Sequence, residues 1–411
     1  MAVAALPGTP ADAVLGLQPS RVFRPTSLDE AEEALRQSAT EGLRMAFVGG
    51  ATELELGAPP IRLDAVVATR GLARVLEYAP LDQIVTVESG VTLGALQALL
   101  REKRQMLALD PPWAERATLG GLVATNAFGP RRTRYGSVRD LIIGVTLIRA
   151  DGTRAKGGGK VVKNVAGFDL PKLMVGSLGS LGLIGTVTFR LHPLPESAST
   201  VVCARASASA VGRLMTQMRQ EQLEPSAVAA VWSGAGLDVG CRFEGFGAGV
   251  RKQRDRLAAL ALKLDLPHEV LDDSAAVSFW SRQAAVREAP ATVRAKLATP
   301  PSDIRRLVDE VWPALRDVLQ APRAVFYPTL GLSFVAGNMP SAEALAAAIA
   351  SARTSLAPKG GHLVLHAAPS QLRARTDVWG PAPSGAILFR RVKDALDPDH
   401  RLAPGRTVGG L

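Results

Sequence analysis

Three clusters of small residues form the part of the sequence best suited to chemistry. They read VGGAT at residues 48–52, ATLGGLVAT at residues 117–125 and GSLGSLG at residues 176–182. Successive backbone N–H groups on glycine-rich turns form concave sites for anions, and the missing Cβ atoms let a ligand approach the backbone closely. A single cluster of this kind is most often only a tight turn. Three of them in the first half of the chain predict a cradle for a pyrophosphate.

The first cluster does not match the two best-known phosphate fingerprints. Gly49 and Gly50 are adjacent and the next glycine is Gly57, which breaks the GxGxxG pattern of dinucleotide-binding folds. No Gly-Lys-Ser/Thr follows, so the P-loop of nucleotide hydrolases is excluded as well. The sequence therefore favours a phosphate site that is built from turns.

The segments around these clusters predict both helices and strands. Ser27 precedes an amphipathic helix and is followed three residues later by Glu30, which is the pattern of a capping box. Thr92 precedes a second helix with a stripe of leucines, and the β-branched residues within 75–88 indicate two strands. The fold class that follows is α+β.

Composition divides the chain into four parts. Residues 1–19 lack the basic start and the sustained apolar core of a signal peptide, so they read as a flexible tail. Two prolines end the glycine-rich domain, which we place at residues 20–195. Residues 196–385 have no glycine cluster of this kind and predict a second α+β domain. Residues 386–411 predict an amphipathic helix, stopped by a proline, and an extended tail.

Charge and cysteine content limit the class of function. The 411 residues include 48 basic and 38 acidic ones, and the net charge of +10 favours an acidic partner, an anionic ligand or a membrane surface without choosing among them. Aromatic residues make up 5%, which is too few for the stacking platforms of single-stranded nucleic-acid binding. The two cysteines, Cys203 and Cys241, exclude a disulfide framework and a cysteine-bound iron–sulfur cluster and indicate a reducing, cytoplasmic setting. No apolar run approaches the roughly 20 residues of a membrane span, so we expect a soluble or at most peripheral protein.

Two histidines have a spacing that can bind a metal ion on a helix. His362 and His366 are four residues apart, but the Leu-Val-Leu between them and the two glycines before them favour a strand. On a strand these two positions are about 13 Å apart, too far for one ion. We therefore expect no metal site here.

An arginine-rich segment, GPRRTRYGSVRD at residues 129–140, has two interpretations. It is either a solvated basic loop, or it places Arg131 or Arg132 beside a phosphate or carboxylate group, which Arg can bind with two parallel hydrogen bonds. Further on, Asp169 precedes Leu-Pro and is interpreted as the cap of that turn rather than as a catalytic group.

Taken together, the motifs resemble a known family. In order and spacing they are similar to the vanillyl-alcohol-oxidase (PCMH-type) FAD-binding proteins, and above all to the FAD-binding subunits of bacterial glycolate oxidases. The similarity is strong over residues 20–195, weak through the middle and clear again at the end. The segments that carry it are VGGATEL, ATLGGLVATNAFGPRRTRYGSVRDLIIGV, VVKNVAGFDLPKLMVGSLGSLGLIG and DPDHRLAPGR.

This resemblance implies a fold and a set of cofactor contacts. The fold would be a PCMH-type FAD-binding domain of two α/β subdomains, an α+β cap domain that contacts substrate or another subunit, and a C-terminal tail that returns to the FAD domain. No catalytic residue and no metal ligand is implied. The implied FAD-binding residues are Gly49, Gly50, Ala51 and Thr52 at the pyrophosphate, Thr118, Gly120, Gly121, Ala124 and Thr125 along a second wall, and Gly182, Leu183 and Ile184 near the ribityl chain or adenine.

The sequence departs from the family pattern at three places. Members with covalently bound flavin carry a His just after the glycine turn, whereas this chain has Thr52 and Glu53 there, so the FAD should be noncovalent. The usual Asn-Pro-Gly of the C-terminal motif begins with Ala403, which removes one side-chain hydrogen bond near the isoalloxazine. The related D-type flavin subunits carry Glu at the position of Leu178 and a His-x-Gly-Asp-Gly-Asn-x-His metal motif, which is absent here.

The resemblance also implies an activity and partners. The activity would be oxidation of the small 2-hydroxy acid glycolate to glyoxylate, with FAD taking the hydride or relaying electrons. Because the chain has too few cysteines for a cluster of its own, it would depend on a D-type flavin subunit and an iron–sulfur F-type subunit. Two alternatives stay open: a free-standing FAD-dependent hydroxy-acid or alcohol oxidase, and an FAD-free subunit that only scaffolds its partners.

Overall fold

The computed structural model describes residues 3–160 and 168–411. The chain divides into two compact units. The sequence places residues 129–135 inside the glycine-rich domain, but in the structure this short segment belongs to the second unit. The first unit consists of Met1–Phe128, Gly136–Pro193 and Pro381–Leu411, and the second of Gly129–Tyr135 and Leu194–Gly380.

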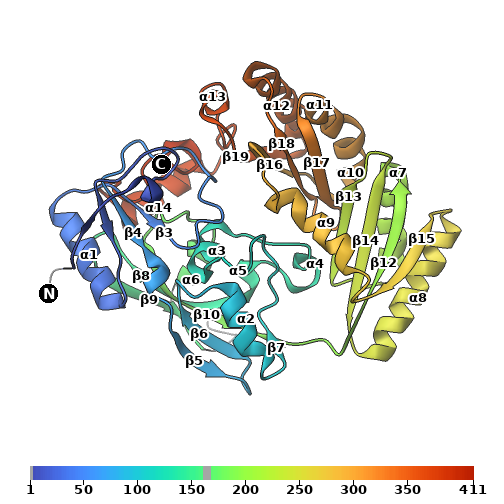
Figure 1. Cartoon of the computed structure of the whole chain (residues 1–411), viewed down its shortest axis with the longest axis horizontal. Helices are drawn as coiled ribbons and strands as arrows, with labels where there is room; N and C mark the ends of the chain where they lie inside the picture. The colour runs from blue at the N-terminus through green and yellow to red at the C-terminus, as the bar shows by residue number, and fades with distance from the viewer. Residues whose placement is uncertain (1–2, 161–167) are drawn as a thin grey trace. The chain divides into compact units, whose positions relative to one another are not determined.

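The smaller sheet of the first unit is four-stranded (Figure 1). Its order is β1-β2-β4-β3, and β2, β4 and β3 run parallel. The helix α1 (Leu28–Thr40) connects β2 to β3, and the predicted cap is confirmed because Ser27 Oγ accepts a hydrogen bond of 3.2 Å from Glu30 N. The strands are β1 (Leu6–Pro7), β2 (Arg21–Phe23), β3 (Met45–Val48) and β4 (Ala65–Ala68).

The expectation of a flexible tail at residues 1–19 is wrong for most of this segment. Strand β1 pairs antiparallel with β2, with Leu6 opposite Val22. Val14 is fully buried and packs in a cluster with Val22 and Val66. The burial of apolar area against an existing sheet offsets the entropy lost when such a segment is ordered.

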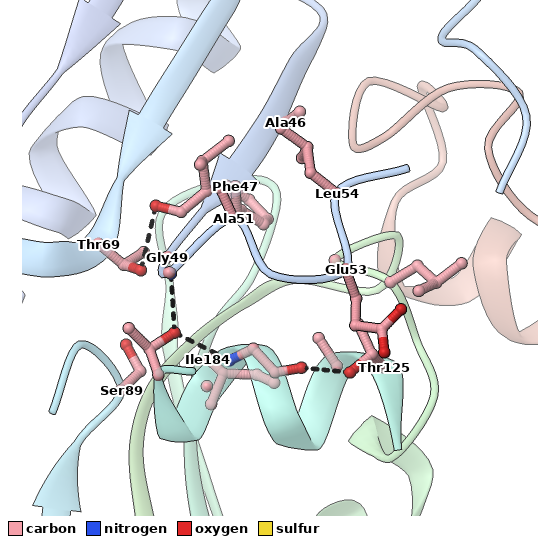
Figure 2. A pocket seen from close by; sticks show the side chains of 18 of the residues that line it. Ala46, Phe47, Gly49, Ala51, Glu53, Leu54, Thr69, Ser89, Thr125 and Ile184 are labelled. Carbon is pink, nitrogen blue, oxygen red and sulfur yellow. Dashed lines mark hydrogen bonds between the residues drawn. The ribbon is translucent and has the colours of Figure 1, made fainter. Parts of the chain in front are cut away.

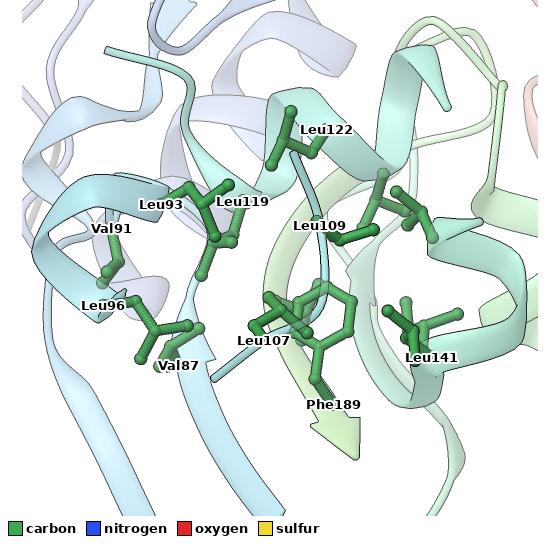
Figure 3. Close-up of a cluster of buried hydrophobic side chains, with 14 of the residues drawn as sticks. Val87, Val91, Leu93, Leu96, Leu107, Leu109, Leu119, Leu122, Leu141 and Phe189 are labelled. Carbon is green, nitrogen blue, oxygen red and sulfur yellow. The ribbon is translucent and has the colours of Figure 1, made fainter. Parts of the chain in front are cut away.

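The larger sheet of the first unit has the order β5-β6-β10-β8-β9, and all neighbours are antiparallel. Helices pack on it through a common apolar core, in which Leu96 and Leu119 meet Phe189 and Val87 of the sheet (Figure 3). Each such buried side chain contributes about 1.5–3 kcal/mol. The elements are β5 (Val75–Ala79), β6 (Ile84–Glu88), α2 (Leu93–Arg101), α3 (Leu119–Thr125), α5 (Val138–Leu141), β8 (Ile142–Ile148), β9 (Arg154–Gly158), α6 (Leu170–Met174) and β10 (Leu183–Arg190), with a separate pair of β7 (Gln105–Met106) and β11 (His192–Pro193).

The C-terminal segment returns to the first unit, as the sequence predicts. The helix α14 (Ala386–Leu396) is followed by a tail that runs parallel to β3. Met45 N donates to Arg401 O at 2.8 Å, and Ala403 N donates to Met45 O at 2.7 Å. The tail therefore extends the edge of the smaller sheet beside the first glycine cluster.

The second unit is built on an eight-stranded antiparallel sheet. Its order is β15-β12-β14-β13-β17-β18-β16-β19. The strands are β12 (Ser197–Ala206), β13 (Ala227–Trp232), β14 (Leu237–Gly245), β15 (His268–Asp272), β16 (Val293–Ala298), β17 (Gln320–Tyr327), β18 (Leu332–Asn338) and β19 (His362–Ala367). The helices are α4 (Arg132–Tyr135), α7 (Ala208–Gln220), α8 (Gly247–Lys263), α9 (Val277–Glu288), α10 (Ile304–Arg306), α11 (Trp312–Arg316), α12 (Ala342–Leu356) and α13 (Ser370–Arg373).

Mixed helices and sheets confirm the predicted α+β fold class. Among the helices of residues 3–160 and 168–411, none combines the length and the apolar character needed to cross a membrane.

Candidate functional site

One cleft in the first unit is lined by all twelve residues that the sequence assigns to the cofactor (Figure 2). Its free space is about 850 Å³, including the open mouth. The three glycine clusters, far apart in sequence, thus form the walls of a single site. Its lining also includes residues that the sequence analysis did not select, among them Ser89, Leu178, Ala403 and Arg406.

The first wall is the turn that follows β3. A Cβ atom at Gly49 would lie 2.2 Å from Thr118 Oγ1, and one at Gly50 would lie 2.0 Å from Arg116 O, so neither position has room for a side chain. The next residue, Ala51, has a left-handed backbone with φ of 56°. Within the part of the chain that the structure describes, the amides of Ala51 and Thr52 donate no hydrogen bond. The turn can therefore offer backbone N–H groups to a ligand.

Thr118 joins the first wall to the second. Its buried Oγ1 accepts hydrogen bonds from Gly50 N at 3.3 Å and from Gly121 N at 3.4 Å. Thr118 is thus both the N-cap of α3 and an anchor for the glycine turn. Gly120 N donates to Ser89 O at 2.8 Å, which fixes α3 against the end of β6.

The third cluster is attached to the other end of α3. Gly176 N donates to Val123 O, and Leu178 N donates to Ala124 O, both at 2.9 Å. Leu178 has a φ of 51°, so this loop contains a left-handed non-glycine residue just as the first cluster does. At Gly182, with φ of 152°, an added Cβ would lie 2.4 Å from a side-chain carbon of Leu147. Position 182 in this loop therefore has no room for a side chain larger than that of glycine.

The C-terminal tail supplies the remaining wall and a positive charge. Ala403, at the position where the family has Asn, lines the cleft with a left-handed φ of 45°. Arg406 is 5% exposed, and its guanidinium donates to the carbonyl oxygens of Leu54 at 2.9 Å and Leu56 at 2.7 Å. Sequence reasoning missed Arg406, although its place directly after the Ala-Pro-Gly motif is a usable signal.

A buried lysine holds the tail to the third cluster. Lys393 on α14 is 1% exposed, and its Nζ donates to Ser180 O at 2.7 Å, to Leu402 O at 2.7 Å and to Asp397 Oδ2 at 2.5 Å. Burial lowers the pKa of Lys393, and the Asp397 carboxylate acts in the opposite direction. Two walls of the cleft are thus joined by one ammonium group.

The arginine-rich segment does not take part in this cleft. Arg131 donates to Glu244 at 2.7 Å inside the second unit, and Arg242 donates to the same carboxylate at 2.9 Å. These two arginines lower the pKa of Glu244 although its burial acts to raise it. Arg131 is thus held by a carboxylate of the protein itself, and its 24% side-chain exposure does not fit a fully solvated loop.

Two smaller predictions are confirmed. Asp169 Oδ1 accepts a hydrogen bond from Lys172 N at 3.3 Å, which makes it the cap of α6. His362 and His366 lie on strand β19, and burial lowers the pKa of His362. Over the described ranges no group of three or more His, Cys, Asp and Glu residues could hold a metal ion.

Residues 19–158 match the model of a family described as an FAD binding domain. This part of the chain is an FAD binding domain. It includes the first two glycine clusters, so two of the three glycine-rich walls of the cleft lie in the matched region. The resemblance read from the sequence is thereby confirmed for the cofactor class.

Two curated relatives match part of the chain. The chain is 34% identical over 202 residues to "Glycolate oxidase subunit GlcE" of Escherichia coli (strain K12), which covers 48% of this chain and 55% of that protein. It is 35% identical over 173 residues to "D-lactate dehydrogenase" of Archaeoglobus fulgidus, which covers 42% of this chain and 38% of that protein. The matched region thus spans about half, or less, of the length of these relatives.

The whole fold is shared with solved flavoproteins. A structure of p-cresol methylhydroxylase superposes with a TM-score of 0.74 at 14% sequence identity and covers 95% of this chain and 88% of that one. Such low identity shows the fold alone. The predicted PCMH-type architecture is confirmed, because the likeness extends through both units of the chain.

Proposed function

We propose that the chain is the FAD-binding subunit of a glycolate oxidase (dehydrogenase) complex that oxidises a small 2-hydroxy acid, glycolate, to glyoxylate. The observation that carries the proposal is the single cleft in which three glycine clusters meet, two of them within the residues that match an FAD binding domain. The substrate class is supported by the similarity to a glycolate oxidase subunit and to a D-lactate dehydrogenase, both named for 2-hydroxy acids.

The residues of the cleft fit FAD in their chemistry. A dinucleotide is polar at its centre and needs close backbone approach there. Gly49 and Gly50 line the cleft, and the absence of side chains lets their turn pack directly against Thr118 and Arg116. The amides of Ala51 and Thr52 would donate to the pyrophosphate, and the guanidinium of Arg406 adds positive charge to the same cleft. The second wall along the cofactor would be formed by Thr118, Gly120, Gly121, Ala124 and Thr125. Gly182 to Ile184 would lie along the ribityl chain or adenine. When bound, FAD would supply a two-electron acceptor for the oxidation.

We predict that this FAD is released by denaturation. The residues after the glycine turn, Thr52 and Glu53, offer no His for a bond to the flavin. Acid precipitation of the purified protein should therefore leave the yellow chromophore in the supernatant. A chromophore that stays with the pellet through washing would contradict noncovalent binding.

The proposal makes this chain dependent on partner subunits for electron transfer. Cys203 and Cys241 are both fully buried in the second unit, and burial raises the pKa of Cys203 to about 11. Two inert thiols are too few for an iron–sulfur cluster, which is commonly held by four cysteines. Electrons taken up by the flavin would then leave through a D-type flavin subunit or an iron–sulfur F-type subunit. The net charge of +10 would favour docking to an acidic subunit.

We predict that the isolated chain oxidises glycolate poorly and that full activity requires the complex. The Glu of D-type subunits is replaced by Leu178, which lines the cleft, and their metal motif is missing from the sequence. The measurement is the rate of dye-linked glycolate oxidation per bound flavin, for the isolated chain and for the reconstituted complex. Equal rates would contradict the dependence on partners and would favour a free-standing oxidase.

A further inference from the structure

Ser89 has a side chain in the cleft whose hydroxyl has no protein partner. The residue is 1% exposed and follows β6 directly, with its Oγ buried and without a hydrogen-bond partner among the described residues. A buried donor left unsatisfied is costly, and most buried hydroxyls in folded proteins have a partner. The unpaired hydroxyl of Ser89 therefore indicates a hydrogen-bond partner on a bound ligand.

The backbone of Ser89 is held in place by hydrogen bonds on both sides. Ser89 N donates to Gly185 O at 2.9 Å, and Ser89 O accepts from Gly120 N at 2.8 Å. The Cβ of Ser89 lies only 2.6 Å from the point that a Cβ on Gly120 would occupy. Figure 2 shows the Ser89 side chain in the same cleft as the Gly49 turn. The site is thus built around Ser89 before any ligand arrives.

From this geometry we infer that the Ser89 hydroxyl donates a hydrogen bond to bound FAD, as a binding residue that joins the twelve assigned above. This inference rests on the proposed cofactor and adds a side-chain contact to a site otherwise described by backbone and small residues. An Ala at this position would remove the donor and would also remove the unsatisfied group of the FAD-free protein. The variant should therefore separate cofactor affinity from stability, since only the bound state loses an interaction.

The test is a comparison of Ser89→Ala with wild type by FAD titration of the FAD-free protein, followed by flavin fluorescence. We expect the dissociation constant for FAD to rise about 5- to 10-fold, the size of one hydrogen bond. The thermal midpoint of the FAD-free variant should equal or exceed that of wild type. A dissociation constant within about twofold of wild type, or a clear fall of the FAD-free midpoint, overturns the inference.

Ser333 provides a matched control. It is also 1% exposed, and its Oγ also lacks a partner in the described structure, but it lies on β18 of the second unit and does not line the cleft. Ser333→Ala should leave FAD affinity unchanged, and an equal loss in both variants would overturn the inference. If the wild-type chain binds no FAD, both the proposed function and this inference are contradicted. If Ser89→Ala binds FAD as tightly as wild type, only the inference is contradicted.

Discussion

Gly50→Val is expected to remove most of the bound flavin while the chain still folds. The Cβ atom of the valine would lie 2.0 Å from Arg116 O and 3.2 Å from Thr118 N, which are both backbone atoms. To relieve this overlap the turn must move away from the second wall, which breaks the hydrogen bond from Gly50 N to Thr118 Oγ1. The left-handed residue of the turn is Ala51, so the effect comes from close packing at Gly50 and not from its φ. Overpacking costs about 1–3 kcal/mol, and a cost of that size at the binding turn corresponds to a loss of affinity of about 5- to 160-fold.

The ratio of flavin to protein absorbance measures this loss, and far-UV circular dichroism reports whether the fold survives. Gly249→Val is the matched control, because Gly249 lies in α8 and a Cβ there meets no atom within 4 Å. The control should keep its full flavin content. If Gly50→Val is folded and also keeps it, the phosphate site lies elsewhere.

Local features of this fold could be predicted from the sequence because their causes are local. Ser27 and Thr92 cap their helices through hydrogen bonds to residues three positions on, which a pattern of types and spacing reveals. The strand at His362 and the cap at Asp169 were predicted in the same way. The glycine clusters likewise indicate where the backbone passes close to another part of the protein or to a ligand.

The meeting of those clusters could not be derived from spacing, because it depends on contacts between distant residues. The hydrogen bond from Gly50 to Thr118 spans 68 positions, and the one from Arg406 to Leu54 spans 352. The resemblance to a family supplied that knowledge for the twelve assigned residues, but it was silent on Ser89 and Arg406. The pairing of Arg131 with the buried Glu244 could not be derived for the same reason, since the two residues are 113 positions apart.

Lys393→Met is expected to destabilise the first unit by about 3–5 kcal/mol, because removal of one partner leaves a buried charge uncompensated. The side chain of Asp397 is fully buried, and without the ammonium group it keeps only two backbone donors, Arg401 N at 3.1 Å and Leu402 N at 2.8 Å. The carbonyl oxygens of Ser180 and Leu402 lose a donor as well. Urea denaturation followed by the flavin signal reports on this unit.

Two further variants make the cause of that loss specific. Adding Asp397→Asn to Lys393→Met removes the unpaired buried charge, so the double variant should be more stable than Lys393→Met alone. A double variant with fully additive losses would mean that the two groups do not interact.

The exposed pair of Arg36 and Glu33, 2.5 Å apart with side chains 53% and 34% exposed, is the control for ion pairing in general. Arg36→Met should cost less than about 1 kcal/mol, because solvent screens an exposed pair. A similarly small cost for Lys393→Met would show that the tail and the third glycine cluster are held together by other contacts.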